Sequence, residues 1–514
     1  MKAIVCFLCV GVALVGASGC GNSNNSSTVH PGGGGVLTPG ASGAPGASGG
    51  PAGAGAPGGL IVPDISGSSD PGQMCDGGSC GCPSGSTTTI SGYVYDPAGK
   101  NPLYNISVYV PDPSSPLPNL DNVPLACGCS QLFPTKVLAT GSPTDATGHF
   151  EIPCAPSGTV SLVVQTGKWR KQYDGITVTP NQDNKVPNMR LPANSAEGSL
   201  PNIAISTGGS DSFECLPLRL GVSASEYVAG SAAGGHVHIY TGYRGAALAA
   251  GAVESASNLW DTQAHMNEHD MMILSCEGQE TTGGTPGAPV NATAQGLLMN
   301  YTNAGGRVFA SHYHYVWFNT GPFATAPNNI ATWNVGAQHV DDTRGIPAVI
   351  DTTLSTGAAF PEGSALEQWL NLVGALTNNQ LPIWFARTNV QALAQPPSTE
   401  WIHVDQSEAA APLSTQYFSV DTPINAASNA VCGRVVYSDL HVTGGPGLNA
   451  PGVAADYPTG NTTGGGMGGM HGGVVPTECA VRPLTPQEEA LEFMLFDLSS
   501  CLVPIGQSPP MTVR

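Results

Sequence analysis

Beyond residue 200, short continuous apolar runs alternate with segments of helical spacing and with polar loops. Such runs are typical of parallel strands, which bury both faces between layers of helices. The segment 291–306 has the spacing of a helix that stops at Gly305, directly before one of these runs. The pattern predicts an α/β domain with a mostly parallel sheet over residues 196–514. Its strands are expected within residues 201–209, 236–243, 269–278, 305–318 and 432–442.

Residues 320–430 are less regular and form an insert in this domain. Within it, Ser364-Ala365-Leu366-Glu367 has the sequence of a capping box and predicts a helix through Leu376. A second box begins at Thr485 and is completed by Glu488, with an apolar helical stripe after it. The two boxes predict two further helices, the second of them amphipathic.

The preceding segment has a different pattern. Residues 87–193 hold short β-branched runs bounded by Pro, Gly, Asn and Asp, which predicts an all-β fold. Gly92-x-Val94-x-Asp96-x-x-Gly99, followed by Thr-Asp-Ala-x-Gly-x-Phe at 144–150, resembles the carboxypeptidase regulatory-like family of small transthyretin-like sandwiches. This resemblance implies a spacer or binding module, not a catalyst, over the cysteine-containing residues 73–195.

The N-terminal residues have the pattern of an export signal. Lys2 precedes a short apolar stretch, and residues 17–21 resemble a bacterial lipobox in which Cys20 is diacylated. We expect a signal peptide over 1–19 and a lipidated Gly/Pro/Ser-rich linker over 20–72, too poor in large apolar side chains to fold. The alternative is ordinary secretory cleavage near Gly19. The lipid reading predicts an outer-membrane lipoprotein of the bacterial envelope, facing the periplasm or the cell surface.

The charge composition excludes one class of partner. Only 10% of the 514 residues are charged, and the formal net charge is −20. Such a chain has no basic footprint for nucleic acid, and anionic lipid would repel it. Attachment to a membrane is therefore expected through the N-terminal lipid. The remaining expected partners are carbohydrate or another envelope protein.

The chain has 14 cysteines, of which Cys6 and Cys9 leave with the signal peptide and Cys20 carries the lipid. Eleven remain, so at least one is expected to be free or paired with another molecule. In an oxidising compartment disulfides are the default, and the irregular spacing of the first six disfavours zinc. The disulfide candidates are Cys75, Cys80, Cys82, Cys127, Cys129, Cys154, Cys215, Cys276, Cys432, Cys479 and Cys501.

Polar clusters follow four of the predicted strands. In an open parallel sheet, ligands bind outside the carboxyl ends of the strands. The clusters are 207–211, 275–278, 311–314 and 438–441, and we expect them to converge on one crevice. The candidate ligand-binding residues are Asp211, Glu277, Ser311, His312, His314, Asp439 and His441.

The same segments resemble the class I glutamine-amidotransferase-like superfamily, and within it the trehalose-utilisation-type domains. The resemblance rests on residues 269–278, 300–306, 307–316 and 432–442 and implies a flavodoxin-like fold. Amidotransferases place a cysteine nucleophile at the turn after a strand, whereas Ala310-Ser311-His312-Tyr313-His314 has none. Cys276 ends the preceding strand, so a disulfide, for example with Cys215, is favoured over a nucleophile.

Three interpretations of the histidines remain open. With a period of two, His312 and His314 share one side of a strand, and with Asp439 and His441 they are candidate ligands of a divalent metal such as zinc or iron. A polar crevice for a small ligand and purely structural histidines are the alternatives. Met467, Met470 and His471 lie in a Gly-rich loop, where a copper site is disfavoured.

These observations favour an exported envelope protein with a non-catalytic ligand-binding or structural role, with carbohydrate as a possible ligand by resemblance alone. The alternative is a metal-dependent hydrolase or sugar-processing enzyme that uses the strand-end His/Asp cluster. Its candidate catalytic residues are His312, Glu277 and Asp439, with Glu277 as the base.

Overall fold

A computed structural model describes residues 82, 85–246, 248, 254–280, 290–335, 345–404, 414–443, 479, 482–502 and 505. These residues belong to one compact unit, 56–514. The expected signal peptide, the lipidated Cys20 and the linker lie outside the described residues, as do Cys75, Cys80 and the loop with Met467, Met470 and His471.

The first part is an all-β sandwich, as predicted for residues 87–193. Its core is formed by inward-facing side chains such as Ile90, Phe150 and Leu162. One sheet has the order β4-β1-β7, with β8 also on β1, and the other has the order β3-β2-β5-β6. The strands are β1 Thr89–Tyr95, β2 Ser107–Pro111, β3 Val137–Thr140, β4 His149–Ile152, β5 Gly158–Thr166, β6 Trp169–Val178, β7 Asp183–Lys185 and β8 Met189–Arg190.

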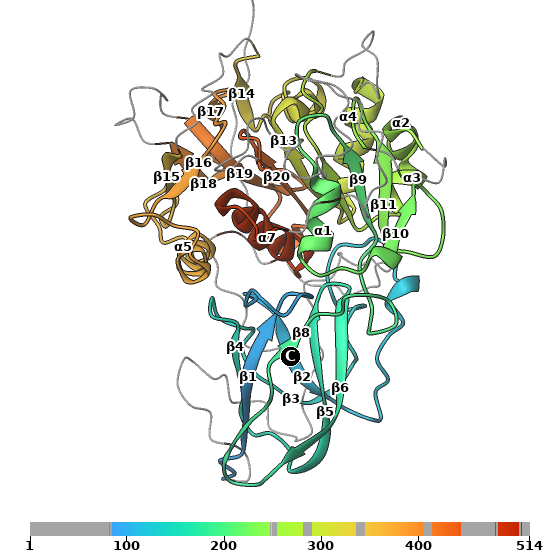
Figure 1. Ribbon diagram of the computed structural model, residues 1–514, viewed down its shortest axis with the longest axis vertical. Coiled ribbons are helices and arrows are strands. Elements are labelled where there is room, and N and C mark those ends of the chain that lie inside the picture. The colour runs from blue at the N-terminus through green and yellow to red at the C-terminus, as the bar shows by residue number, and fades with distance from the viewer. Residues whose placement is uncertain are drawn as a thin grey trace, which may run out of the picture. The chain divides into compact units, whose positions relative to one another are not determined.

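A ten-stranded sheet forms the centre of the second part (Figure 1), in the order β10-β11-β9-β12-β13-β20-β19-β18-β15-β16. Pairing is parallel from β10 to β20 and antiparallel from β20 to β16. The strands are β9 Ile203–Thr207, β10 Tyr227–Ala229, β11 Val237–Thr241, β12 Met271–Leu274, β13 Arg307–Ser311, β15 Ile346–Ile350, β16 Leu381–Ile383, β18 Ser398–Val404, β19 Ser414–Thr422 and β20 Gly433–Ser438.

The prediction of a mostly parallel sheet therefore holds for one half of the sheet only. The insert around 320–430 supplies β15, β16, β18 and β19, which extend the same sheet with antiparallel strands. Two further strands of the insert, β14 Ala331–Trp333 and β17 Val390–Leu393, pair separately. Because β19 buries polar residues such as Gln416 and Ser419, its sequence lacks the apolar run by which a central strand is recognised.

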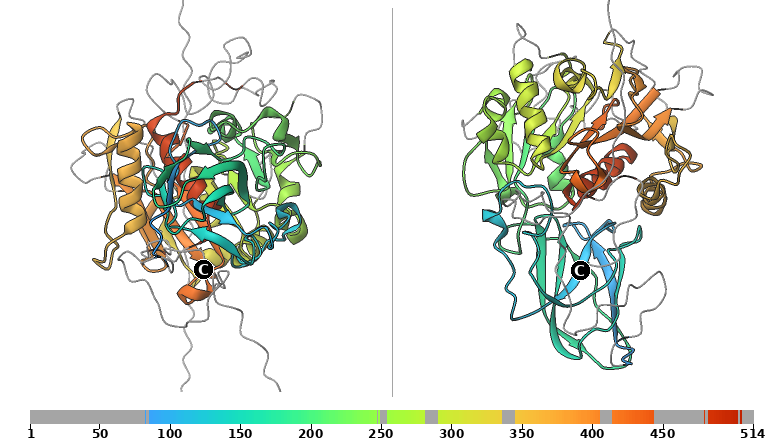
Figure 2. Two further views of the ribbon diagram at one scale, coloured as in Figure 1. Left: turned by 90° about the horizontal axis from the view of Figure 1, so that it is seen from below. Right: turned by 180° about the vertical axis from the view of Figure 1, so that it is seen from behind.

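Alternate residues of the parallel strands enter two hydrophobic clusters. Ile203 and Ile205 belong to one cluster and Ala204 to the other, and β12 and β13 alternate in the same way. Helices α1 and α7 pack on the first face and α4 on the second (Figures 1 and 2). The helices are α1 Leu216–Arg219, α2 Ala256–Leu259, α3 Gln263–Asn267, α4 Ala292–Asn303, α5 Pro361–Val373 and α7 Pro486–Ser499. Short 3-10 helices are η1 Leu120–Asn122, η2 Phe213–Cys215, η3 Ala224–Glu226, η4 His312–Trp317, η5 Gly321–Phe323 and η6 Ser428–Ala430.

One of the two predicted capping boxes is confirmed. The Thr485 hydroxyl accepts the backbone N–H of Glu488, and the Glu488 side chain accepts the N–H of Thr485. The box at Ser364 is wrong, because α5 begins one turn earlier with Pro361 at its first position. Ser364 then lies inside the helix, where its hydroxyl donates to the carbonyl of Phe360.

Helix α7 contacts the sandwich as well as the large sheet. Phe493 stacks on Tyr104 at a centroid distance of 5.6 Å, and Phe496 lies 5.9 Å from Trp169. The sandwich is also tied covalently, because the β2–β3 loop forms the disulfides Cys127–Cys432 and Cys129–Cys501. Among the described residues, no helix is long and apolar enough to cross a membrane.

The disulfide interpretation is confirmed for eight of the nine described candidate cysteines. Besides the two bonds to the sandwich loop, Cys82 pairs with Cys154 and Cys215 with Cys479. The expected pairing of Cys215 with Cys276 is therefore wrong. Cys276 is the free, buried cysteine of the described chain, which agrees with the odd number in the sequence.

Candidate functional site

The four polar clusters meet at one edge of the sheet, as the strand pattern predicts. Their strands β9, β12, β13 and β20 are adjacent and parallel, so their carboxyl ends lie in line. Ser311 stands opposite Ser438 in the register. None of the seven candidate ligand-binding residues is more than 3% exposed.

His312 begins a sharp turn at this edge. Strand β13 ends at Ser311, η4 begins at His312, and the φ of His312 is 38°. A side chain at this φ is strained, and such strain is often found at functional sites. The prediction that His312 and His314 share one side of a strand is therefore wrong, since the strand has ended before either residue.

Cys276 lies against the His312 ring. Its Sγ is 3.4 Å from His312 Nδ1, and the N–H of Gly278 points at the same sulfur from 3.5 Å. The N–H of Cys276 donates to the Ser311 hydroxyl at 2.9 Å, which fixes the two strand ends relative to each other. Complete burial raises the pKa of the Cys276 thiol, so the group is a protonated thiol at neutral pH.

His441 follows the end of β20 and lies beside Cys276 and His312. Its ring meets that of His312 edge to face, with centroids 4.7 Å apart, and its Nδ1 is 3.4 Å from Asp211 Oδ2. Asp211 also accepts the Ser311 hydroxyl at 2.8 Å and the N–H and hydroxyl of Thr443. Burial raises the pKa of Asp211 to about 7, and the hydrogen bonds from Ser311 and Thr443 oppose this shift.

Cys276, His312 and His441 can each turn one ligand atom toward the others. These three atoms all lie within 4.8 Å of one another, and all three residues are buried. The set differs from the predicted metal ligands, since Cys276 stands where His314 and Asp439 were expected.

His314 and Asp439 are engaged elsewhere. His314 Nε2 bonds the carbonyl of Ser275 at 2.8 Å, and its Nδ1 accepts the indole N–H of Trp317. Asp439 Oδ2 accepts the N–H groups of Asn389 and Val390, while Tyr437 donates to Oδ1. Both residues thus hold neighbouring segments in place.

Glu277 points to a different neighbour as well. Its Oε1 accepts the N–H of Tyr243 at 2.9 Å, which ties it to the loop after β11. Asp211 is the strand-end carboxylate that lies at ion-pair distance from His441, with Oδ2 3.4 Å from Nδ1.

The sequence offered no sign of Arg387, a buried residue of the insert. Its positive charge opposes the effect of burial on the pKa values of Asp211, Cys276 and Asp439, so it lies close to all three. The Gln416 side chain donates to the Arg387 carbonyl at 2.8 Å, which anchors this segment to β19. No motif in residues 320–430 marks this position.

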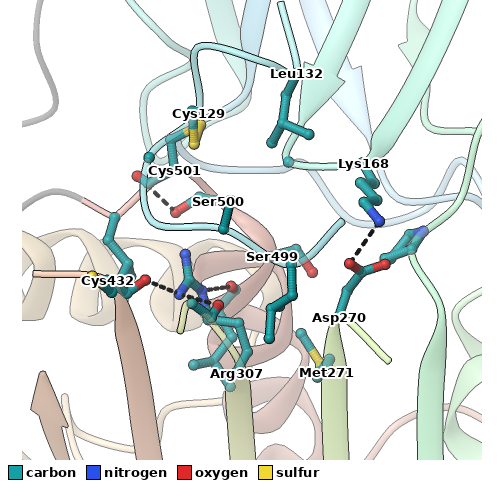
Figure 3. Close-up of a pocket in the computed structure, with 18 of the residues that line it drawn as sticks. Cys129, Leu132, Lys168, Asp270, Met271, Arg307, Cys432, Ser499, Ser500 and Cys501 are labelled. Carbon is teal, nitrogen blue, oxygen red and sulfur yellow. Dashed lines mark hydrogen bonds and ion pairs between the residues drawn. A yellow bond between two sulfur atoms is a disulfide. The ribbon is translucent and has the colours of Figure 1, made fainter. Parts of the chain in front are cut away.

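A cavity lies at the opposite edge of the sheet (Figure 3), near Met271, Arg307 and Cys432 at the beginnings of β12, β13 and β20. Arg307 donates to the carbonyls of Leu498, Gly305 and Cys432, and Lys168 pairs with Asp270 at 2.8 Å. This cavity is bordered by the disulfides to the sandwich. It shares no residue with the strand-end site, that is, with Asp211, Cys276, Ser311, His312 and His441.

Comparisons with known proteins do not assign the chain to a family. No protein-family model matches the sequence, and a search of curated proteins gives no match. The solved structures that match in part include two interface mutants of a type II cohesin–X-dockerin complex from Acetivibrio cellulolyticus. The N-terminal mutant is 15% identical over 29% of this chain and 88% of the solved chain, with a TM-score of 0.16. The C-terminal mutant is 14% identical over 26% and 84%, with a TM-score of 0.15. Similarity at this level supports no statement about the fold or the function of this chain.

Proposed function

We propose that this chain is an exported, lipid-anchored envelope protein that binds a ligand at its strand-end site without turning it over. The observation that supports this proposal is the buried group of Cys276, His312 and His441 at the edge where parallel sheets bind ligands. The flavodoxin-like and amidotransferase-like descriptions of the second part, and the carboxypeptidase regulatory-like description of the sandwich, belong to the same proposal.

The absence of catalysis is argued from the groups at the turn. A nucleophile must reach its substrate, but the turn carries His312, and the Cys276 thiol behind it is 0% exposed. The Ser311 hydroxyl donates to Asp211 and accepts from the N–H of Cys276, so it is engaged as well. Neither the Cys276 thiol nor the Ser311 hydroxyl is therefore available as a nucleophile.

A second candidate function is a metal-dependent hydrolase. It is favoured by the three converging ligand atoms of Cys276, His312 and His441, because three protein ligands and an open position are typical of catalytic zinc sites. Its expected base, Glu277, is held by the N–H of Tyr243. This arrangement favours binding over hydrolysis.

Carbohydrate is proposed as a ligand only by the resemblance to trehalose-utilisation-type domains. Tyr315 and Trp317 are fully buried and cannot offer a stacking platform, while Tyr313 is partly exposed beside His312. A carbohydrate would therefore contact Tyr313 alone among these three aromatic residues.

A turnover assay tests the proposal directly. Purified full-length chain, with and without added zinc, is assayed against chromogenic esters, glycosides and γ-glutamyl amides. We expect no rate above that of the His312→Ala variant. Turnover that is lost in His312→Ala would contradict the binding role and favour the hydrolase. Metabolic labelling with a radioactive fatty acid tests the anchor, and labelling is expected to disappear in Cys20→Ser.

A further inference from the structure

We propose that Cys276, His312 and His441 form a binding centre for a zinc-like divalent metal ion. This inference rests on the proposed ligand-binding role of the strand-end site and names the chemical class of its ligand. The three residues come from the ends of β12, β13 and β20, so adjacent strands of one sheet hold the site.

The distances fit a tetrahedral ion. Zinc binds sulfur at about 2.3 Å and imidazole nitrogen at about 2.0–2.1 Å, which places the two ligand atoms of a tetrahedral site roughly 3.6 Å apart. The distance from Cys276 Sγ to His312 Nδ1 is 3.4 Å. No pair of ligand atoms in the group exceeds 4.8 Å, so shifts of about an ångström complete the geometry.

The donor set decides the kind of metal. One thiolate and two imidazoles favour zinc or another borderline-soft ion and disfavour magnesium and calcium, which prefer oxygen ligands. On binding, the Cys276 thiol releases its proton to solvent and the sulfur forms the bond to the metal.

Asp211 has the position of an orienting carboxylate. Ligating histidines commonly donate their other ring nitrogen to a carboxylate, which fixes the ring and raises its basicity. Asp211 Oδ2 lies 3.4 Å from His441 Nδ1, so a small rotation of the ring forms this hydrogen bond when Nε2 binds the metal. The Ser311 hydroxyl bonds both Asp211 and the N–H of Cys276, so one residue couples this carboxylate to the thiol.

The strained turn supports the same reading. His312 holds a φ of 38°, a conformation that glycine would adopt without cost. The turn places the imidazole over Cys276 and beside His441. A histidine that served packing alone would not need this backbone.

The structure has a second group of candidate metal ligands, and an experiment must distinguish metal bound there from metal bound at Cys276, His312 and His441. Asp351, Glu400 and His403 also lie within 4.8 Å of one another, and all three are partly exposed. Irregular pairing in β18 turns Glu400 and His403 toward the same side despite their spacing of three. His403→Ala is therefore a matched control, since it removes an imidazole from this second group alone.

The test loads the untagged full-length chain with zinc or cobalt under conditions that keep its disulfides intact. Metal content is measured after dialysis, together with the near-ultraviolet absorption of a Co²⁺–thiolate bond. We expect about one equivalent of metal and the thiolate band in the wild type and in His403→Ala. In Cys276→Ala and His441→Ala we expect less than about a tenth of an equivalent and no band.

A wild type that binds no metal, or a Cys276→Ala variant that keeps full metal content, would overturn the inference. If the alanine variants do not fold, crystals of the zinc-loaded wild type decide: an anomalous peak within bonding distance of Cys276 Sγ supports the inference, and its absence there overturns it. The two proposals fail separately. If the chain binds no metal and shows no turnover, only the metal inference is refuted. If it shows turnover that depends on His312, the non-catalytic binding role is refuted.

Discussion

Sγ of Cys276 lies 3.4 Å from Nδ1 of His312, across the boundary between the neighbouring parallel strands β12 and β13. The strand order creates this relationship, because the residues that follow two paired parallel strands emerge side by side. His441 follows β20, the next strand in the sheet, and joins the same group. The chemistry of the site is thus a consequence of the parallel half of the sheet.

Relief of backbone strain at His312 gives the first prediction. Since its φ is 38°, His312→Gly is expected to be more stable than His312→Ala by about 1 kcal/mol. Both variants lose the imidazole, so their difference isolates the backbone. Chemical denaturation of the two variants measures it, and an alanine variant that is the more stable one would refute the strain.

The disulfides between the sandwich loop and the second part give the second prediction. Cys127–Cys432 joins residues 305 positions apart, and closure of so long a loop restricts the unfolded chain. Replacing both cysteines by serine is expected to lower the free energy of unfolding by about 2–5 kcal/mol. Protease cleavage near the β2–β3 loop should also become faster.

The matched control for that variant removes Cys82–Cys154, whose cysteines are 72 positions apart and enclose strands β1 to β4 of the sandwich. Its loss is expected to leave cleavage of the β2–β3 loop unchanged. Equal cleavage rates in the two variants would show that the Cys127–Cys432 bond does not secure the loop.

An acidic group between the sandwich and α7 gives a prediction about pH. Burial raises the pKa of Asp96 to about 6 and that of Glu489 to about 7, and burial also raises the pKa of Glu492. The Asn101 amide donates to the carboxylates of Glu489 and Glu492. The charge of Lys100 lowers the pKa of Asp96 and so partly offsets the effect of burial, whereas the charge of Glu488 raises the pKa of Glu489 further.

Because these pKa values are higher in the folded chain than in the unfolded chain, the group stabilises the fold fully below about pH 4. This contribution is lost as the pH rises through about 7. Urea denaturation between pH 5 and pH 8 measures the change. Glu492→Gln, which stays uncharged, is expected to flatten the pH dependence and to be more stable than the wild type at pH 8. A variant with the same slope as the wild type would exclude this group as its source.

Loss of the side-chain hydroxyl is predicted to affect stability differently at Thr485 and at Ser364, the two positions with capping-box sequences. Thr485→Ala removes a complete capping box and is expected to cost about 1 kcal/mol of stability. Ser364→Ala removes a hydroxyl that only bonds the Phe360 carbonyl inside α5, and it is expected to be nearly neutral or stabilising. Thermal denaturation of both variants checks the order, and a larger loss at Ser364 would contradict it.

The sequence was sufficient to predict the parallel strands and the polar edge, because continuous apolar runs ended in polar clusters at 207–211, 275–278, 311–314 and 438–441. The sequence was not sufficient to predict which side chains at that edge contact one another. His314 has the same chemistry as His312, and only the start of η4 turns it toward Ser275. The free cysteine was expected from parity, but parity does not identify Cys276 among eleven candidates.

The antiparallel half of the sheet was missed for a physical reason. β19 buries Ser414, Gln416 and Ser419, whose side chains find hydrogen-bond partners inside the fold, so its pattern is that of neither a half-exposed nor an apolar strand. Arg387 enters the site from this region. The places of β19 and Arg387 depend on contacts with distant parts of the chain, and a local pattern of polar and apolar residues does not predict such contacts.

The most direct test of the account is an anomalous difference map at the zinc absorption edge, from crystals of the full chain loaded with zinc. The account predicts one dominant peak bounded by Cys276 Sγ and the rings of His312 and His441. A map without that peak, or one whose dominant peak lies at Asp351, Glu400 and His403, would contradict it.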